Sequence, residues 1–204
     1  AREVAKAGLG EALVSLHAST AELSDGITEA PGAFEQTVSG INHLRAEGVR
    51  VIVNFVIHTA NQTELPAFVR FVASRWPDMI VNVSFVHAAS DIVPRQRDLV
   101  PRYSDAMPWL LESVDEAKRL DVRLTGLQSL CGLPLCLVPT AILDGLELPD
   151  LSATEEDSEM KKVSACSGCA LDTRCHGVRS SYVELYGANE LSPLPIQSNV
   201  TGPE

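Results

Sequence analysis

Residues 49–57, VRVIVNFVI, constrain the fold more than any other part of this sequence. A nearly continuous run of β-branched residues is typical of a strand that is covered on both faces, as in a parallel sheet. Shorter apolar runs predict three further strands, at 12–17, 80–86 and 122–124. Apolar residues at helical spacing predict helices at 34–44, from 61 to about 75, and at 103–120. Asn61 and Glu64 have the spacing of a capping box at the start of the second helix.

Alternating strands and helices with connections of this length predict parallel strands joined by right-handed crossovers, and hence an α/β fold. Ligands of such folds bind at the carboxyl ends of the strands. Three successive predicted strands end at or just before a histidine, namely His17, His58 and His87. Each of them taken alone is more readily interpreted as an ordinary loop histidine with a backbone partner. Together, at the edge where α/β proteins bind ligands, they predict a pocket.

The charge balance narrows the class of partner. The net charge is −11 and the pI is about 4.9, whereas binding to nucleic acid or to an anionic membrane requires a clustered basic face. We therefore expect no nucleic-acid partner. No apolar stretch of about 18 residues is present, so we expect no membrane span either. All five cysteines lie between positions 131 and 175, which is typical of a reducing compartment. We therefore expect a cytoplasmic protein.

The cysteine spacing is Cys131-x4-Cys136 and then, after a long gap, Cys166-x2-Cys169-x5-Cys175. In a C-x2-C pair, two thiolates of one tight turn can face the same metal. Cys175 follows closely enough to be a third ligand, and either Cys136 or Cys131 can be the fourth. Four cysteines suit tetrahedral zinc and an iron–sulfur cluster alike, so the spacing predicts a metal site without choosing between the two. Buried free cysteines, or two disulfides with one cysteine left over, are the plainer interpretations.

Several segments follow one another in an order that is known from one enzyme family. They are LVSLHASTAELSDGITEAPGAFEQTVSGINHLRAEGVRV, VNFVIHTANQTELPAFVRFV, IVNVSFVHA and the pattern Cys166-x2-Cys169-x5-Cys175-x-Gly177. In these segments the chain resembles the second half of a radical SAM enzyme followed by a short auxiliary-cluster extension of the SPASM/Twitch kind. The resemblance implies an α/β fold with an incomplete, TIM-barrel-like (β/α) partial barrel of parallel strands and an irregular Cys-rich cluster-binding extension. It implies a barrel part at 1–125, an auxiliary cluster domain at 126–190 and a flexible tail at 191–204.

The chain departs from this family at two points. The C-x3-C-x2-C loop that holds the SAM-cleaving cluster is absent, so we expect an N-terminally truncated fragment that is inactive by itself. Arg179 stands where the SPASM pattern has a further cysteine, which favours a single auxiliary cluster of the Twitch kind. Three interpretations of Arg179 remain: it neutralises a thiolate cluster, it contacts the substrate, or it only folds its loop back over the cluster.

The resemblance implies an oxidoreductase whose intact form cleaves S-adenosyl-L-methionine (SAM) reductively and modifies a peptide or a small molecule by radical chemistry. Its cofactors would be SAM, an auxiliary 4Fe–4S cluster and a catalytic 4Fe–4S cluster in the missing region, with a flavodoxin or ferredoxin as electron donor. The implied SAM-binding residues are Ser15 and His17 at the ribose or methionine, Asn54, Ile57 and Asn61 along the nucleoside, and Phe85, Val86 and His87 near the adenine. The implied metal ligands come from Cys131, Cys136, Cys166, Cys169 and Cys175. The plainer alternatives are strand-end packing for Ile57, Phe85 and Val86, and helix capping for Asn61.

A function of another class fits the same cysteines. A non-catalytic α/β domain with a structural Cys₄ zinc site would act as an interaction module, and bound zinc in place of iron would identify it. A third possibility is a partial chain that does not fold by itself, because an unclosed barrel leaves strand edges and apolar faces exposed.

Overall fold

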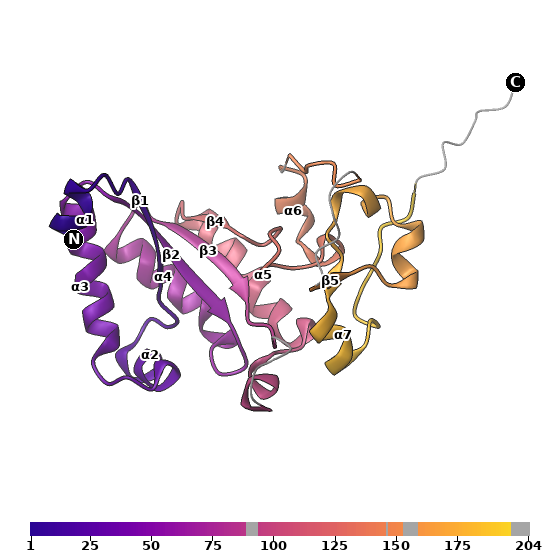
Figure 1. Ribbon diagram of the computed structural model, residues 1–204, viewed down its shortest axis with the longest axis horizontal. Coiled ribbons are helices and arrows are strands. Elements are labelled where there is room, and N and C mark those ends of the chain that lie inside the picture. Colours follow the sequence, from indigo (N-terminus) through magenta and orange to yellow (C-terminus); the bar gives the residue numbers. More distant parts are fainter. Residues whose placement is uncertain (89–93, 146, 153–158, 197–204) are drawn as a thin grey trace, which may run out of the picture.

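The computed structural model describes residues 1–88, 94–145, 147–152 and 159–196. Four parallel strands form its main sheet in the order β1-β2-β3-β4, so the predicted α/β class is confirmed. Within the described residues this sheet is open, with β1 and β4 at its edges. Figure 1 shows the sheet with helices behind it. The strands are β1 (Glu11–Ser15), β2 (Arg50–Ile57), β3 (Ile80–Phe85) and β4 (Arg123–Thr125).

Helices connect the strands where the apolar spacing predicts them. The ring of Phe55 in β2 packs at a tilt against Phe68, with ring centroids 4.7 Å apart, and Leu110 is fully buried in the same core. Burial of this apolar surface supplies most of the stabilisation of such a layer. The helices of this part are α1 (Arg2–Lys6), α2 (Ala21–Thr28), α3 (Ala33–Ala46), α4 (Leu65–Arg75) and α5 (Tyr103–Arg119), and the 3₁₀ turns are η1 (Gln62–Glu64) and η2 (Pro94–Leu99).

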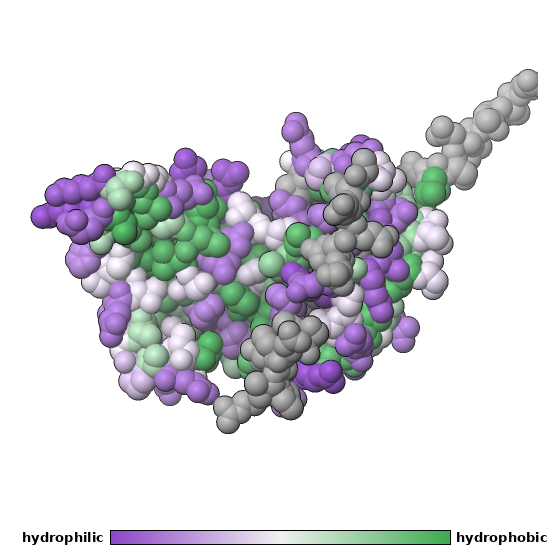
Figure 2. All heavy atoms as spheres, viewed as in Figure 1, coloured by the Kyte–Doolittle hydropathy of each residue, from purple (hydrophilic) through white to green (hydrophobic). Residues whose placement is uncertain are grey.

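The central strand β2 is covered on one face only, so the expectation that 49–57 is covered on both faces is wrong. Val53 and Phe55 are fully buried, whereas Ile52 and Val56 between them remain partly exposed. The helices lie on one side of the sheet, and the opposite face is open (Figure 1). On that open face Leu13 of β1 is 61% exposed. Figure 2 shows hydrophobic side chains gathered over β1 and β2 in this view.

Residues 126–196 form a second and less regular part. An aromatic contact attaches this part to the sheet. The ring of Tyr182 stacks on that of Tyr103, with centroids 3.9 Å apart, and the Tyr182 hydroxyl accepts a hydrogen bond from the backbone N–H of Tyr103 at 2.9 Å. The two parts therefore share one hydrophobic core. The elements are the antiparallel pair β5 (Met160–Lys161) and β6 (Val178–Arg179), the helices α6 (Thr140–Leu143) and α7 (Ser180–Tyr186), and the 3₁₀ turns η3 (Leu135–Leu137), η4 (Ser164–Gly168) and η5 (Asp172–Arg174).

The first part of the predicted tail at 191–204 contacts the cysteine loops. The backbone N–H of Ala170 donates to the carbonyl of Leu194 at 2.8 Å, and Cys169 forms a β-bridge with Pro195. These bonds attach 191–196 to the cysteine loops, and 197–204 lie outside the described residues. In the described part of the chain, no helix combines the length and the apolar content that a membrane span requires.

Candidate functional site

A polar row crosses the open face of the sheet. Ser15, Asn54, Asn82 and Thr125 are register partners on the four consecutive strands. The amide of Asn82 donates to Oδ1 of Asn54 at 2.7 Å, and the hydroxyl of Ser84 donates to the same oxygen at 3.2 Å. Ser15 and Asn54 were predicted from the family resemblance, but the other members were not. The signal that could have found them is the register of parallel strands, which aligns polar positions of equal depth.

Asn61 ties the ends of β1 and β2 together instead of capping a helix. Its Oδ1 accepts from the backbone N–H of His58 at 2.9 Å, and its Nδ2 donates to the carbonyls of His17 and Val56 at 3.0 Å each. Glu64 accepts hydrogen bonds from the backbone and hydroxyl of Ser19. The capping-box prediction is therefore wrong, because both side chains are engaged by the preceding loops. Asn61 is completely buried, and these three bonds all go to the chain itself.

His17 and His58 follow the ends of β1 and β2. Nδ1 of His58 accepts from the backbone N–H of Ala60 at 3.3 Å, so the proton of the neutral ring is on Nε2. Within the described structure, Nε2 of His58 and Nδ1 of His17 are buried and have no hydrogen-bond partner. Burial lowers the pKa of His17, and burial together with the neighbouring His17 lowers the pKa of His58 to about 4. Both rings are therefore neutral at pH 7.

The depressed pKa of His58 predicts a stability that falls in acid. His58 binds a proton near the ordinary pKa of 6.5 in the unfolded chain, and only near 4 in the folded chain. The stability that the neutral ring contributes is therefore fully present above pH 6.5 and is lost as the pH falls toward 4. Between pH 7 and pH 4.5 the loss attributable to His58 is about 2 kcal/mol, since one pKa unit is worth about 1.4 kcal/mol and solvent screening reduces the effect. Urea unfolding at pH 7 and at pH 4.5 measures it. The pH-dependent loss is expected to shrink in His58→Gln and to persist in His43→Gln, a change on the exposed face of α3. An unchanged loss in His58→Gln would contradict the prediction.

Two further residues predicted from the resemblance have side chains in the core. Ile57 is 1% exposed and lies on the helix-covered face of the sheet. Phe85 is also buried, and its ring packs edge-on against Tyr103 at 5.6 Å between centroids. The packing alternative therefore describes both side chains, although Phe85 also lines a pocket with Val86 and His87.

That pocket lies at the carboxyl end of β3. The backbone N–H of Phe85 donates to the carbonyl of Cys131 at 2.7 Å, which holds Cys131 beside the strand end. The guanidinium of Arg179 lies 3.5 Å from the sulfur of Cys131 and pairs with Glu159. His87 lies 4.0 Å from the carboxylate of Glu159, and its pKa is lowered chiefly by burial and by the charge of Arg179.

The other four cysteines line one cavity in the second part of the chain. Its empty space of about 380 Å³ includes open solvent, and Cys131 is not among its lining residues. Burial raises the pKa of the Cys136 thiol, and the charges of the other three sulfurs add to this effect, so the four are within electrostatic reach of each other. The remaining lining is mostly apolar. The cysteines are Cys136, Cys166, Cys169 and Cys175, and their main apolar neighbours are Pro134, Leu171, Leu191 and Pro193.

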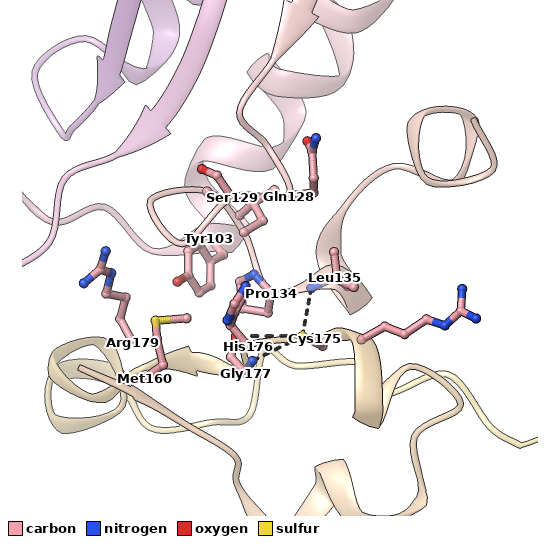
Figure 3. Close-up of a pocket in the computed structure, with 13 residues that line it drawn as sticks. Tyr103, Gln128, Ser129, Pro134, Leu135, Met160, Cys175, His176, Gly177 and Arg179 are labelled. Atoms are coloured by element: carbon pink, nitrogen blue, oxygen red, sulfur yellow. Dashed lines mark hydrogen bonds between the residues drawn. The ribbon is translucent and has the colours of Figure 1, made fainter. Parts of the chain in front are cut away.

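Cys175 receives hydrogen bonds from the backbone. The N–H groups of Leu135 and Gly177 donate to its sulfur at 3.5 and 3.3 Å, as the dashed lines of Figure 3 indicate. Gly177 is required for the approach, because it has a φ of +93° and a Cβ there would lie 2.3 Å from the carbonyl oxygen of Lys161.

The spacing left the choice between Cys131 and Cys136 open, and the fold separates them. Cys136 lies with the C-x2-C turn and Cys175, whereas Cys131 lies at the strand ends beside Arg179. Among the described residues, no three His, Cys, Asp or Glu side chains are arranged to hold a metal ion as they stand. In comparisons with known proteins, no family model matches the chain, and neither does any curated protein.

Proposed function

We propose that the chain is part of a radical SAM enzyme and that the four-cysteine cavity holds its auxiliary 4Fe–4S cluster. The observation that carries the proposal is the gathering of Cys136, Cys166, Cys169 and Cys175 around one apolar cavity, in a part of the chain that shares its hydrophobic core with the parallel sheet. The proposed catalytic partners are SAM, a second 4Fe–4S cluster held by residues outside this sequence, and a flavodoxin or ferredoxin as electron donor. By itself, this chain is expected not to cleave SAM.

The donor set fits a cubane cluster. Four thiolates are the usual ligands of such a cluster, one for each iron. The same four thiolates around a single zinc ion would have to approach to about 2.3 Å from one point. Metal analysis of the purified chain distinguishes the two sites. When bound, the cluster would supply one-electron transfer.

The chain would tune such a cluster in two ways. The backbone N–H groups of Leu135 and Gly177 would stabilise the charge on the Cys175 sulfur. Leu171 and Leu191 would exclude water from the cavity. Hydrogen bonds to sulfur and exposure to solvent are the two means by which proteins set the reduction potential of iron–sulfur clusters. Because four cysteines would ligate every iron, the cluster would transfer electrons or stabilise the fold rather than bind substrate directly.

SAM would bind on the open face of the sheet. Ser15 and Asn54 lie in the polar row there, and its amides and hydroxyls offer donors and acceptors to a nucleoside. His17 lies at the same edge with an unpartnered buried nitrogen. Val86 and His87 follow the end of β3, and the adenine is proposed to bind near them. Ile57 and Asn61 would contribute by shaping the strand ends, since their side chains are buried within the chain.

Anaerobic reconstitution with iron and sulfide tests the proposal. The purified chain is expected to turn brown and to bind about four iron and about four sulfide ions. Colourless protein that retains about one zinc ion and takes up no iron would instead support the structural zinc domain. Metal analysis of the protein as purified, before reconstitution, is the matched control.

A further inference from the structure

Arg179 is the most buried charged side chain at the strand ends. It is only 11% exposed, at the end of β6 and directly before α7. Its Nη2 donates to the carbonyl of Leu130 at 3.1 Å and to the sulfur of Cys131 at 3.5 Å, and its Nη1 pairs with Glu159. Figure 3 shows the guanidinium pointing away from Cys175. This orientation argues against a role in neutralising the four-cysteine cavity.

The guanidinium faces the pocket at the end of β3 instead. The pocket's empty space of about 310 Å³ includes open solvent, and the space within the pocket itself admits about one water molecule. Arg179, His87 and Cys131 all line it, so a cation, an imidazole and a thiol border the same space. The stacked rings of Tyr103 and Tyr182 line its apolar side. A concave site with a few convergent polar groups is the usual form of a small-ligand site.

Glu159 indicates what chemistry this pocket accepts. Its carboxylate pairs with Arg179 and lies 4.0 Å from Nε2 of His87. Glu159 itself is 55% exposed, whereas Arg179 is buried, so the carboxylate can leave to water more easily than the guanidinium can. A desolvated guanidinium is the side chain that best selects carboxylates, because its planar donors match the two oxygens.

We propose that Arg179 and His87 form a binding site for the carboxylate of a ligand, and that Glu159 of the chain holds this site until a ligand replaces it. The ligand would extend from its carboxylate toward the thiol of Cys131. The 3.5 Å between Nη2 of Arg179 and the Cys131 sulfur requires a short spacer between the carboxylate and the group that meets the sulfur. The inference rests on protein side chains alone, and a failure of the metal proposal leaves it intact.

Iodoacetate is a carboxylate probe with such a spacer, and iodoacetamide is its neutral counterpart. With either reagent the Cys131 thiolate attacks the methylene carbon, an S–C bond forms, the C–I bond breaks and iodide leaves. Only iodoacetate carries the group that Arg179 would bind. The ratio of the two rates at Cys131 therefore reports carboxylate binding, and the intrinsic nucleophilicity of the sulfur cancels. Mass spectrometry of the peptide that contains Cys131 measures both rates, and fragmentation distinguishes it from Cys136.

The wild-type ratio is expected to exceed that of free cysteine by about tenfold, which is what one charge-assisted hydrogen bond supplies. Arg179→Gln should reduce the ratio to that of free cysteine, and Glu159→Gln should raise it further because the competing carboxylate is gone. Arg119→Gln, which removes the same charge at an exposed site on α5, should leave it unchanged. Equal ratios in the wild type, Arg179→Gln and Arg119→Gln would overturn the proposal. If Arg179→Gln does not fold, Glu159→Gln decides: a ratio no higher than that of the wild type would overturn it.

Discussion

Replacing Cys136 with serine is expected to lower the iron content of the reconstituted protein to less than about one ion per chain, against about four in the unmodified chain. Cys136 lines the same cavity as the three later cysteines, and its thiol is affected by their charges. Without it, one corner of the proposed cluster loses its protein ligand and is open to water and oxidation. Iron and acid-labile sulfide, measured per chain after anaerobic reconstitution, give the result.

Cys131→Ser is the matched control for that experiment. It makes the same chemical change a few residues earlier, but at the strand ends and outside the cavity. The Cys131 variant is expected to keep the full iron content, whereas Cys166→Ser should lose it as Cys136→Ser does. If Cys131→Ser lost as much iron as Cys136→Ser, the separation of the two cysteines would be wrong as a description of the metal site.

Asn61→Ala is expected to lower the free energy of unfolding by about 3 kcal/mol or more. The change removes the partner of one buried backbone N–H and of two partly buried carbonyls, at about 1–3 kcal/mol for each group that stays buried and unpaired. Because these groups belong to the ends of β1 and β2, the loss should also loosen the edge that carries His17 and His58. Chemical unfolding monitored by circular dichroism measures the difference.

Asn42→Ala provides the comparison for Asn61→Ala. Asn42 accepts one hydrogen bond, from the indole N–H of Trp76 at 2.8 Å. Removing this bond should lower the free energy of unfolding by about 1 kcal/mol. Equal destabilisation by the two substitutions would mean that Asn61 does not tie the strands together as the hydrogen bonds suggest.

The strands and long helices could be predicted because their signal is periodic and local. Which face of the sheet the helices cover could not be predicted in this way. Ile52 and Val56 look like core residues in the sequence, yet they lie on the open face. Which face the helices cover depends on how the crossovers pack, and this is a property of the whole sheet. The polar row shows the same limit, because Asn82 and Thr125 become neighbours only through the strand register.

The side-chain roles at the strand ends were harder to predict for a related reason. A capping box is a local pattern, but Asn61 and Glu64 are engaged by loops that are distant in the sequence. Among the cysteines, the spacing groups Cys166, Cys169 and Cys175, and the three line one cavity. The spacing does not show which of Cys131 and Cys136 lies with them, because a short turn between these two directs them to different pockets. Gly132 permits that turn, since a Cβ there would lie 2.3 Å from the carbonyl oxygen of Leu127.

Mössbauer spectroscopy of the chain reconstituted with ⁵⁷Fe tests the central claim most directly. The claim is that Cys136, Cys166, Cys169 and Cys175 together ligate one 4Fe–4S cluster completely. It predicts a diamagnetic spectrum in which all irons have tetrahedral sulfur coordination, and no iron has an oxygen or nitrogen ligand. A spectrum with one distinct, non-sulfur-ligated iron per cluster would contradict complete ligation. Protein that takes up no iron and retains zinc would contradict the cluster itself.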